Sequence, residues 1–77
     1  MSVTDIALAL SEGKRLRVII RSGQLGCADA QDTCDEFGYL LLYRHGEQYR
    51  IDDPEGENII CVEDFNYIAS IIDSVID

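Results

Sequence analysis

The spacing of hydrophobic residues changes along this chain and predicts the order of its elements. Near the N-terminus apolar residues recur at helical spacing, which predicts a helix over residues 3–12 that begins after Ser2 and stops at Gly13. Residues 15–22 then alternate with period two, which is typical of a half-buried strand. Its apolar face carries Leu16, Val18 and Ile20.

A meander of three strands follows in the middle of the chain. The pattern predicts strands over residues 37–44, 47–52 and 57–62. A tight turn at His45-Gly46 joins the first two strands, and the Asp-Pro-Glu-Gly sequence of residues 53–56 predicts a type I turn between the last two.

Two segments flank this meander. Residues 22–36 are irregular, and residues 28–36 fit either a polar loop or a short helix with its acidic residues along one edge. After the meander, Asp64 is a good N-cap for a closing helix. The apolar stripe of that helix holds Phe65, Ile68, Ala69, Ile72, Val75 and Ile76.

These elements predict the α+β fold class. We expect an antiparallel sheet of about four strands with an N-terminal and a C-terminal helix packed mainly on one face. The length of 77 residues predicts one domain over residues 1–77, of monomeric size.

The charge of the chain is strongly unbalanced. Fifteen Asp and Glu face six Lys and Arg, for a net charge of −9, while 47% of residues are hydrophobic, as in a globular protein. Four of the basic residues lie before Ser22, so the acidity belongs to the rest of the chain. Such a surface repels nucleic acid and anionic membranes and attracts basic proteins. Without a signal peptide or a membrane-length apolar run, the expected location is the cytoplasm.

No pattern of catalytic, cofactor-binding or metal-binding residues accompanies this charge. The three cysteines, Cys27, Cys34 and Cys61, fit no disulfide framework and are interpreted as small hydrophobes or free thiols, with a Cys27–Cys34 bridge as an alternative outside a reducing compartment. Their spacing, even with His45 as a fourth ligand, differs from that of zinc sites. We therefore expect a binding protein without cofactor or metal, and not an enzyme.

The basic residues form a strip of their own on the first strand. Arg15, Arg17 and Arg21 share its solvent face, where we expect them to aid solubility and to pair with neighbouring acids. A phosphate-binding strip is the alternative interpretation.

Two acidic clusters are the candidate partner-binding residues. The first lies in residues 28–36 and the second surrounds the turn at residues 53–56. Proteins grip DNA with Lys and Arg, so a rigid fold carrying many carboxylates can occupy a DNA-binding surface in place of DNA. The alternative is that these acids only keep a small protein soluble. The candidate residues are Asp29, Asp32, Asp35, Glu36, Asp52, Asp53, Glu55 and Glu57.

In size, acidity, α+β layout and absence of catalytic motifs, the chain resembles the small inhibitor proteins of phages, particularly anti-CRISPR proteins. The resemblance implies binding to a CRISPR effector complex at the basic surface that receives target DNA, in the bacterial host cytoplasm. One alternative is an immunity or antitoxin protein that blocks a basic nuclease. Another is an adaptor subunit that binds through an aromatic strand face formed by Tyr39, Leu41 and Tyr43.

Overall fold

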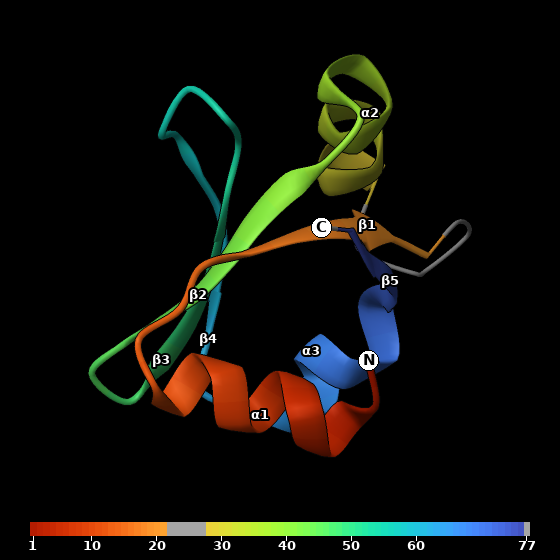
Figure 1. Ribbon diagram of the computed structural model, residues 1–77. Helices are drawn as coiled ribbons and strands as arrows, with labels where there is room; N and C mark the ends of the chain where they lie inside the picture. Colours follow the sequence, from red (N-terminus) through yellow and green to blue (C-terminus); the bar gives the residue numbers. More distant parts are fainter. Residues whose placement is uncertain (22–27, 77) are drawn as a thin grey trace.

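The computed structural model describes residues 1–21 and 28–76, in which three helices and five strands occur in the order α1-β1-α2-β2-β3-β4-α3-β5 (Figure 1). The helices are α1 (Val3–Ser11), α2 (Ala28–Phe37) and α3 (Phe65–Ile71). The strands are β1 (Leu16–Ile20), β2 (Leu40–His45), β3 (Gln48–Asp52), β4 (Asn58–Val62) and β5 (Ile72–Ile76).

The five strands form one antiparallel sheet in the order β4-β3-β2-β1-β5. The predicted meander is present as the neighbouring strands β2, β3 and β4. Gly46 opens the β2–β3 turn with a φ of +62°, a backbone angle that suits a residue without a side chain. The amide of Gly56 donates to the Asp53 carbonyl oxygen at 3.0 Å and closes the β3–β4 turn.

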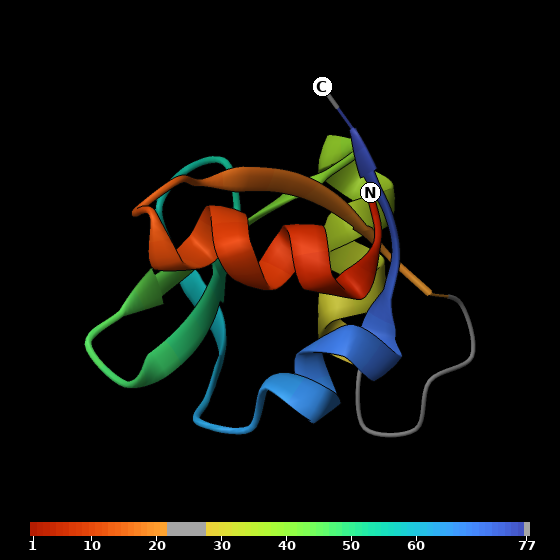
Figure 2. The same ribbon diagram turned by 60° about the horizontal axis from the view of Figure 1, so that its bottom comes forward.

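Helices α1 and α3 cover one face of this sheet, which becomes the core (Figure 2). Each helix buries residues spaced three or four positions apart, which lie on one side of a helix. The buried cluster contains Ile6 and Leu10 of α1 and Ile68 and Ile71 of α3. The sheet supplies alternate residues of its strands to that cluster, among them Val18, Leu40, Leu42 and Ile51, which are 0% exposed.

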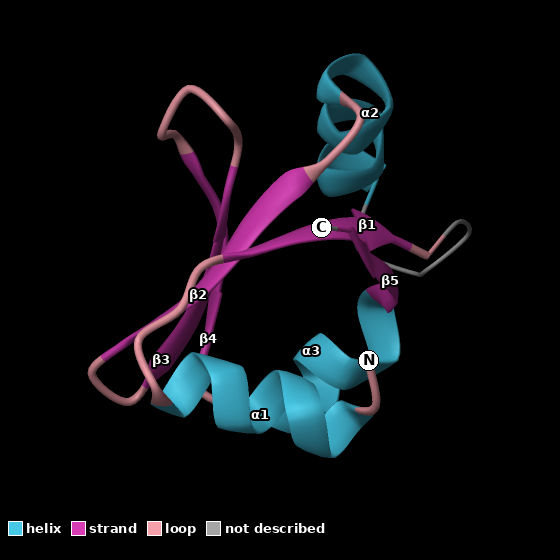
Figure 3. Ribbon diagram, in the orientation of Figure 1, coloured by secondary structure: helices cyan, strands magenta, loops and turns pink. Residues whose placement is uncertain are grey.

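Helix α2 stands apart from the other two helices, at the end of the sheet where the β3–β4 turn also lies (Figures 1 and 3). It contacts β1, β2 and β4. Ala30 and Cys34 anchor it in the core, with exposed fractions of 2% and 4%. Residues 28–36 are therefore helical, which decides between the two interpretations of this segment.

The caps predicted from sequence are confirmed at both ends of the chain. The Asp5 amide donates to Ser2 Oγ at 3.1 Å, while the Ser2 amide donates to Asp5 Oδ2 at 3.3 Å. The Asn66 amide donates to Asp64 Oδ1 at 2.9 Å and begins α3. Gly13 follows α1 with a φ of +82°.

The α+β class is confirmed, and two local predictions are wrong. Residues 37–39 do not begin a strand, because α2 extends through Phe37. The closing helix ends at Ile71, and residues 72–76 form β5, which raises the strand number to five. The β-branched residues in this segment favour a strand, and β1 offers it a free edge, so that Val75 pairs with Val18.

Candidate functional site

The carboxylates of α2 all point into solvent. Asp29, Asp32, Asp35 and Glu36 are each exposed, while the opposite side of the helix is buried through Ala30 and Cys34. Helical spacing therefore puts the predicted first cluster on one outward side of α2.

The second predicted cluster divides into buried and exposed members. Asp53 is only 6% exposed, and its Oδ1 accepts hydrogen bonds from the amides of Glu55 and Glu57, both at 2.9 Å. This carboxylate holds the β3–β4 turn together. The side chains of Glu55 and Glu57 remain exposed.

Asp52 is also buried, with 7% of its surface exposed. Its Oδ2 accepts from the Tyr43 hydroxyl at 2.8 Å, and its Oδ1 accepts from Asn58 Nδ2 at 2.9 Å. The hydrogen bond to Asp52 raises the pKa of Tyr43, and burial and the negative charge of Asp52 act in the same direction. Both oxygens of Asp52 are thus engaged inside the protein.

The fold brings the exposed members of the two clusters to one end of the molecule. Asp29 and Thr33 of α2 line a cleft of about 260 Å³ together with Asp53, Glu57 and Asn58. Within residues 1–21 and 28–76 the ion pair found is Lys14–Glu12, so these carboxylates have no basic partner there. We call this region the acidic end, defined by Asp29, Asp32, Asp35, Glu36, Glu55 and Glu57.

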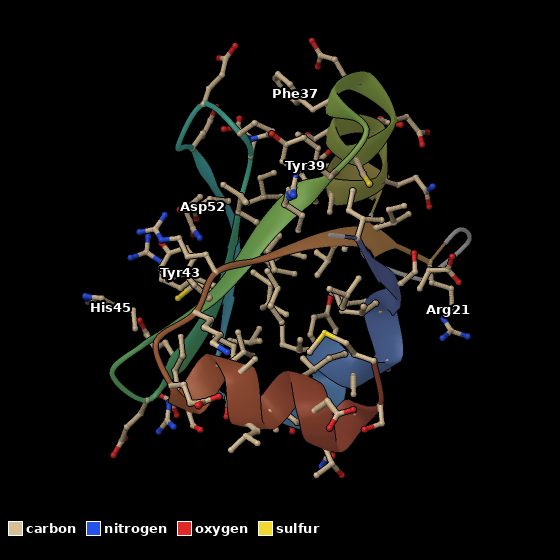
Figure 4. All side chains as sticks on the ribbon, in the orientation of Figure 1. Arg21, Phe37, Tyr39, Tyr43, His45 and Asp52 are labelled. Atoms are coloured by element: carbon tan, nitrogen blue, oxygen red, sulfur yellow. The ribbon has the colours of Figure 1, made fainter. Side chains whose placement is uncertain are left out.

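A second charged region lies on the sheet face opposite α1 and α3. In Figure 4 Tyr43 and Asp52 lie on this side of the sheet, away from both helices. The guanidinium carbon of Arg15 lies 4.4 Å from the centre of the Tyr43 ring, and that of Arg50 lies 5.9 Å from the same centre. The guanidinium carbon of Arg17 lies 5.9 Å from the centre of the Tyr39 ring.

We call this region the arginine–tyrosine face, defined by Arg15, Arg17, Tyr39, Tyr43 and Arg50. The sheet register produces it, because Tyr43 pairs directly with Arg50 across the β2–β3 hairpin. Its side chains are half-buried or exposed. The Nε atom of Arg50 is buried and has no hydrogen-bond partner among the residues that the structure describes.

These contacts bear on the predicted pairing of the basic strip with neighbouring acids. Arg15 and Arg17 lie against tyrosine rings, and neither forms an ion pair with an acid among residues 1–21 and 28–76. Arg21 differs from both, since its Nη2 donates to the Ile72 carbonyl oxygen at 3.3 Å. Cation–π contacts form because β2, the direct neighbour of β1, carries Tyr43 on its outer face and Tyr39 directly precedes that strand.

Sequence reasoning identified the arginines and the tyrosines separately and missed their contact. The alternation of their positions was a usable signal, because residues 15 and 17 alternate along one predicted strand, as residues 39, 41 and 43 do along another predicted strand. Only the register, in which Arg17 pairs with Leu41, brings the two sets together on one face.

The residues considered for metal binding and catalysis are dispersed. His45 is exposed at the end of β2, Cys61 is exposed on β4 and Cys34 lies on the buried side of α2. Cys27, and with it the alternative Cys27–Cys34 bridge, lies outside the described residues. Within the described parts of the chain, no three His, Cys, Asp or Glu side chains converge as metal ligands do.

No helix in the described ranges is long and apolar enough to cross a membrane. Comparisons of the chain with protein-family models, with curated proteins and with solved structures gave no match. The acidic end and the arginine–tyrosine face are the two charged surfaces that bear on its function.

Proposed function

We propose that this protein is a non-enzymatic inhibitor whose acidic end occupies a basic, nucleic-acid-binding surface of a partner protein. The observation that carries the proposal is the convergence of two acidic clusters, distant in sequence, on one end of the fold. Carboxylates on a rigid helix and on a hydrogen-bonded turn present fixed negative charges, as a row of phosphates does.

The cost of this arrangement argues for a role beyond solubility. Asp32 lies three or four positions from three other acids of α2, and like charges at this spacing destabilise a helix. No basic residue in the last turn of α2 offsets the negative end of its dipole. A basic partner surface would neutralise these charges on binding.

The partner we propose is a CRISPR effector complex, at the site that receives target DNA. A basic nuclease blocked by an immunity or antitoxin protein is the alternative partner, because it would be bound through the same acidic end.

Charge reversal at matched positions tests the proposal. Replacing Glu55 and Glu57 by Lys removes two charges from the acidic end, whereas replacing Glu47 and Glu63 by Lys makes the same change in net charge at the opposite end of the β3 and β4 strands. The measurement is competition between the protein and target DNA for a purified, guide-loaded effector complex. We expect the first variant to lose competition and the second to retain it.

A larger reversal covers the α2 part of the acidic end, where Asp29, Asp32, Asp35 and Glu36 are replaced by Lys together. Circular dichroism must show that each variant is folded. If the reversals at the acidic end compete with DNA as well as the parent protein does, the proposal is wrong and the charge serves solubility. If the parent binds a basic toxin nuclease and no effector complex, the immunity alternative replaces it.

A further inference from the structure

The arginine–tyrosine face carries positive charge on a protein whose net charge is −9. Three of the six basic residues of the chain lie on it, and each has its guanidinium group within 5.9 Å of a tyrosine ring centre. Among residues 1–21 and 28–76 no carboxylate forms an ion pair with these groups, and the buried Asp52 carboxylate accepts its hydrogen bonds from Tyr43 and Asn58.

Stacking prepares these arginines for binding. A guanidinium that lies on an aromatic ring loses part of its rotamer freedom before any partner arrives, so less entropy is lost when a partner binds. Its N–H groups point outward from the edge of the plane and fit the two oxygens of a carboxylate. Arg and Tyr are also among the residues enriched at binding hot spots.

The spacing of the arginines selects an extended partner. Arg15 directly precedes β1 and Arg17 is the second residue of that strand, so at the rise of a strand their backbones are separated by about 6.6 Å. Alternate residues of an extended peptide have the same repeat and point to the same side. An acidic residue at every second position of such a peptide would therefore meet both arginines.

We propose that the arginine–tyrosine face binds an extended acidic segment of a partner protein. Carboxylates of the segment pair with the guanidinium groups of Arg15 and Arg17, and Arg50 adds positive charge from the neighbouring part of the sheet. A short segment fits the site better than a nucleic acid, because the long polyanion would run into the field of the acidic end. This surface and the acidic end are different sites, so the two proposals stand independently.

The probe for this site is a short fluorescently labelled peptide of alternating Glu and Leu, and binding is measured by fluorescence anisotropy at low salt. We expect the parent protein to bind this peptide and not the analogue in which every Glu is replaced by Gln. The double variant Arg15→Gln/Arg17→Gln should bind it at least about tenfold more weakly, since hydrogen bonds to charged groups are lost.

Two control variants separate the site from general electrostatics. Arg21→Gln removes one positive charge on the opposite side of the molecule from Tyr43, and we expect it to change the affinity less than about twofold (Figure 4). Arg15→Lys/Arg17→Lys keeps the charge but removes the planar fork, and it should still weaken binding severalfold.

Other outcomes overturn the inference. Equal binding of the Glu and Gln peptides, or equal binding by the parent and the double Gln variant, shows that these arginines bind no carboxylates. Tighter binding of a single-stranded thymidine oligonucleotide than of the peptide shows that the face is a nucleic-acid site. The peptide test is independent of the competition with target DNA, because the two tests concern different surfaces. The Glu55→Lys/Glu57→Lys variant should therefore still bind the peptide.

Discussion

At the acidic end six carboxylates project from α2 and the β3–β4 turn without a basic partner in the part of the chain that the structure describes, whereas on the arginine–tyrosine face three guanidinium groups lie against tyrosine rings. The first region leaves its charges free in solvent, and the second holds them in place on the sheet. The difference indicates two modes of recognition: long-range attraction to a basic surface and short-range, oriented pairing with carboxylates.

The boundary between these regions passes through two neighbouring acids. Asp52 supports the arginine–tyrosine face through its hydrogen bond from Tyr43, while Asp53 supports the acidic end by fixing the turn that carries Glu55 and Glu57. Both carboxylates are buried and hydrogen-bonded within the protein. Each therefore supports its surface by holding neighbouring residues in position.

The largest effect is expected at Asp53. Asp53→Ala leaves two amides of the turn without their acceptor, and we expect the free energy of unfolding to fall by about 1–3 kcal/mol. Urea denaturation followed by circular dichroism measures this change. Glu55→Ala is the matched control and should stay within about 0.5 kcal/mol of the parent. Equal losses in both variants would contradict the division between buried and exposed acids.

The next largest change in stability is expected for Tyr43, and it should depend on pH. Tyr43→Phe removes the hydrogen bond to Asp52 and should cost about 1–2 kcal/mol at neutral pH. Because the folded state raises the pKa of Tyr43, its stabilising contribution is present below about pH 10 and is lost as the pH rises through the raised pKa. Urea midpoints measured across this alkaline range should fall more steeply for the parent than for Tyr43→Phe. Parallel curves would show that the Tyr43–Asp52 contact does not control this titration.

Arg15 tests the arginine–tyrosine face without a ligand. Arg15→Ala removes the closest stack on Tyr43 and should lower the stability by about 0.5–1 kcal/mol. Its neighbour Lys14 is exposed, and its ion pair with Glu12 has an N–O distance of 3.8 Å, so Lys14→Ala should change the stability by much less. Thermal unfolding of both variants distinguishes an ordered guanidinium from a solvated one. A larger loss of stability for Lys14→Ala than for Arg15→Ala would show that the contact with Tyr43 does not hold the Arg15 guanidinium in place.

The smallest expected effect is a gain at the acidic end. Glu36→Lys places a cation in the last turn of α2, four residues after Asp32, and should raise the stability by about 0.3–1 kcal/mol. The same change should weaken competition with target DNA if this end binds a basic surface. If the Glu36→Lys variant is more stable but competes with target DNA as well as the parent protein does, Glu36 is not part of the binding surface.

Local patterns were sufficient for much of the fold. Helical spacing and caps located α1 and the start of α3, and alternation with turn residues located β1 and the β2–β3–β4 meander. These signals depend on residues close together in the sequence, so they can be recognised without the tertiary structure. The six exposed residues of the acidic end were likewise among the residues predicted from clustering.

Other features were decided by contacts between distant segments. Residues 72–76 have an apolar spacing compatible with a helix, but the free edge of β1 draws them into the sheet as β5. Asp52 and Asp53 resemble their acidic neighbours in sequence, yet hydrogen bonds within the β3–β4 region make them internal. The sequence by itself determined the residue types on each element and its local periodicity. The tertiary structure decided which arginines contact tyrosine rings and which acids are buried, because pairing between strands and packing of the β3–β4 turn depend on the whole chain.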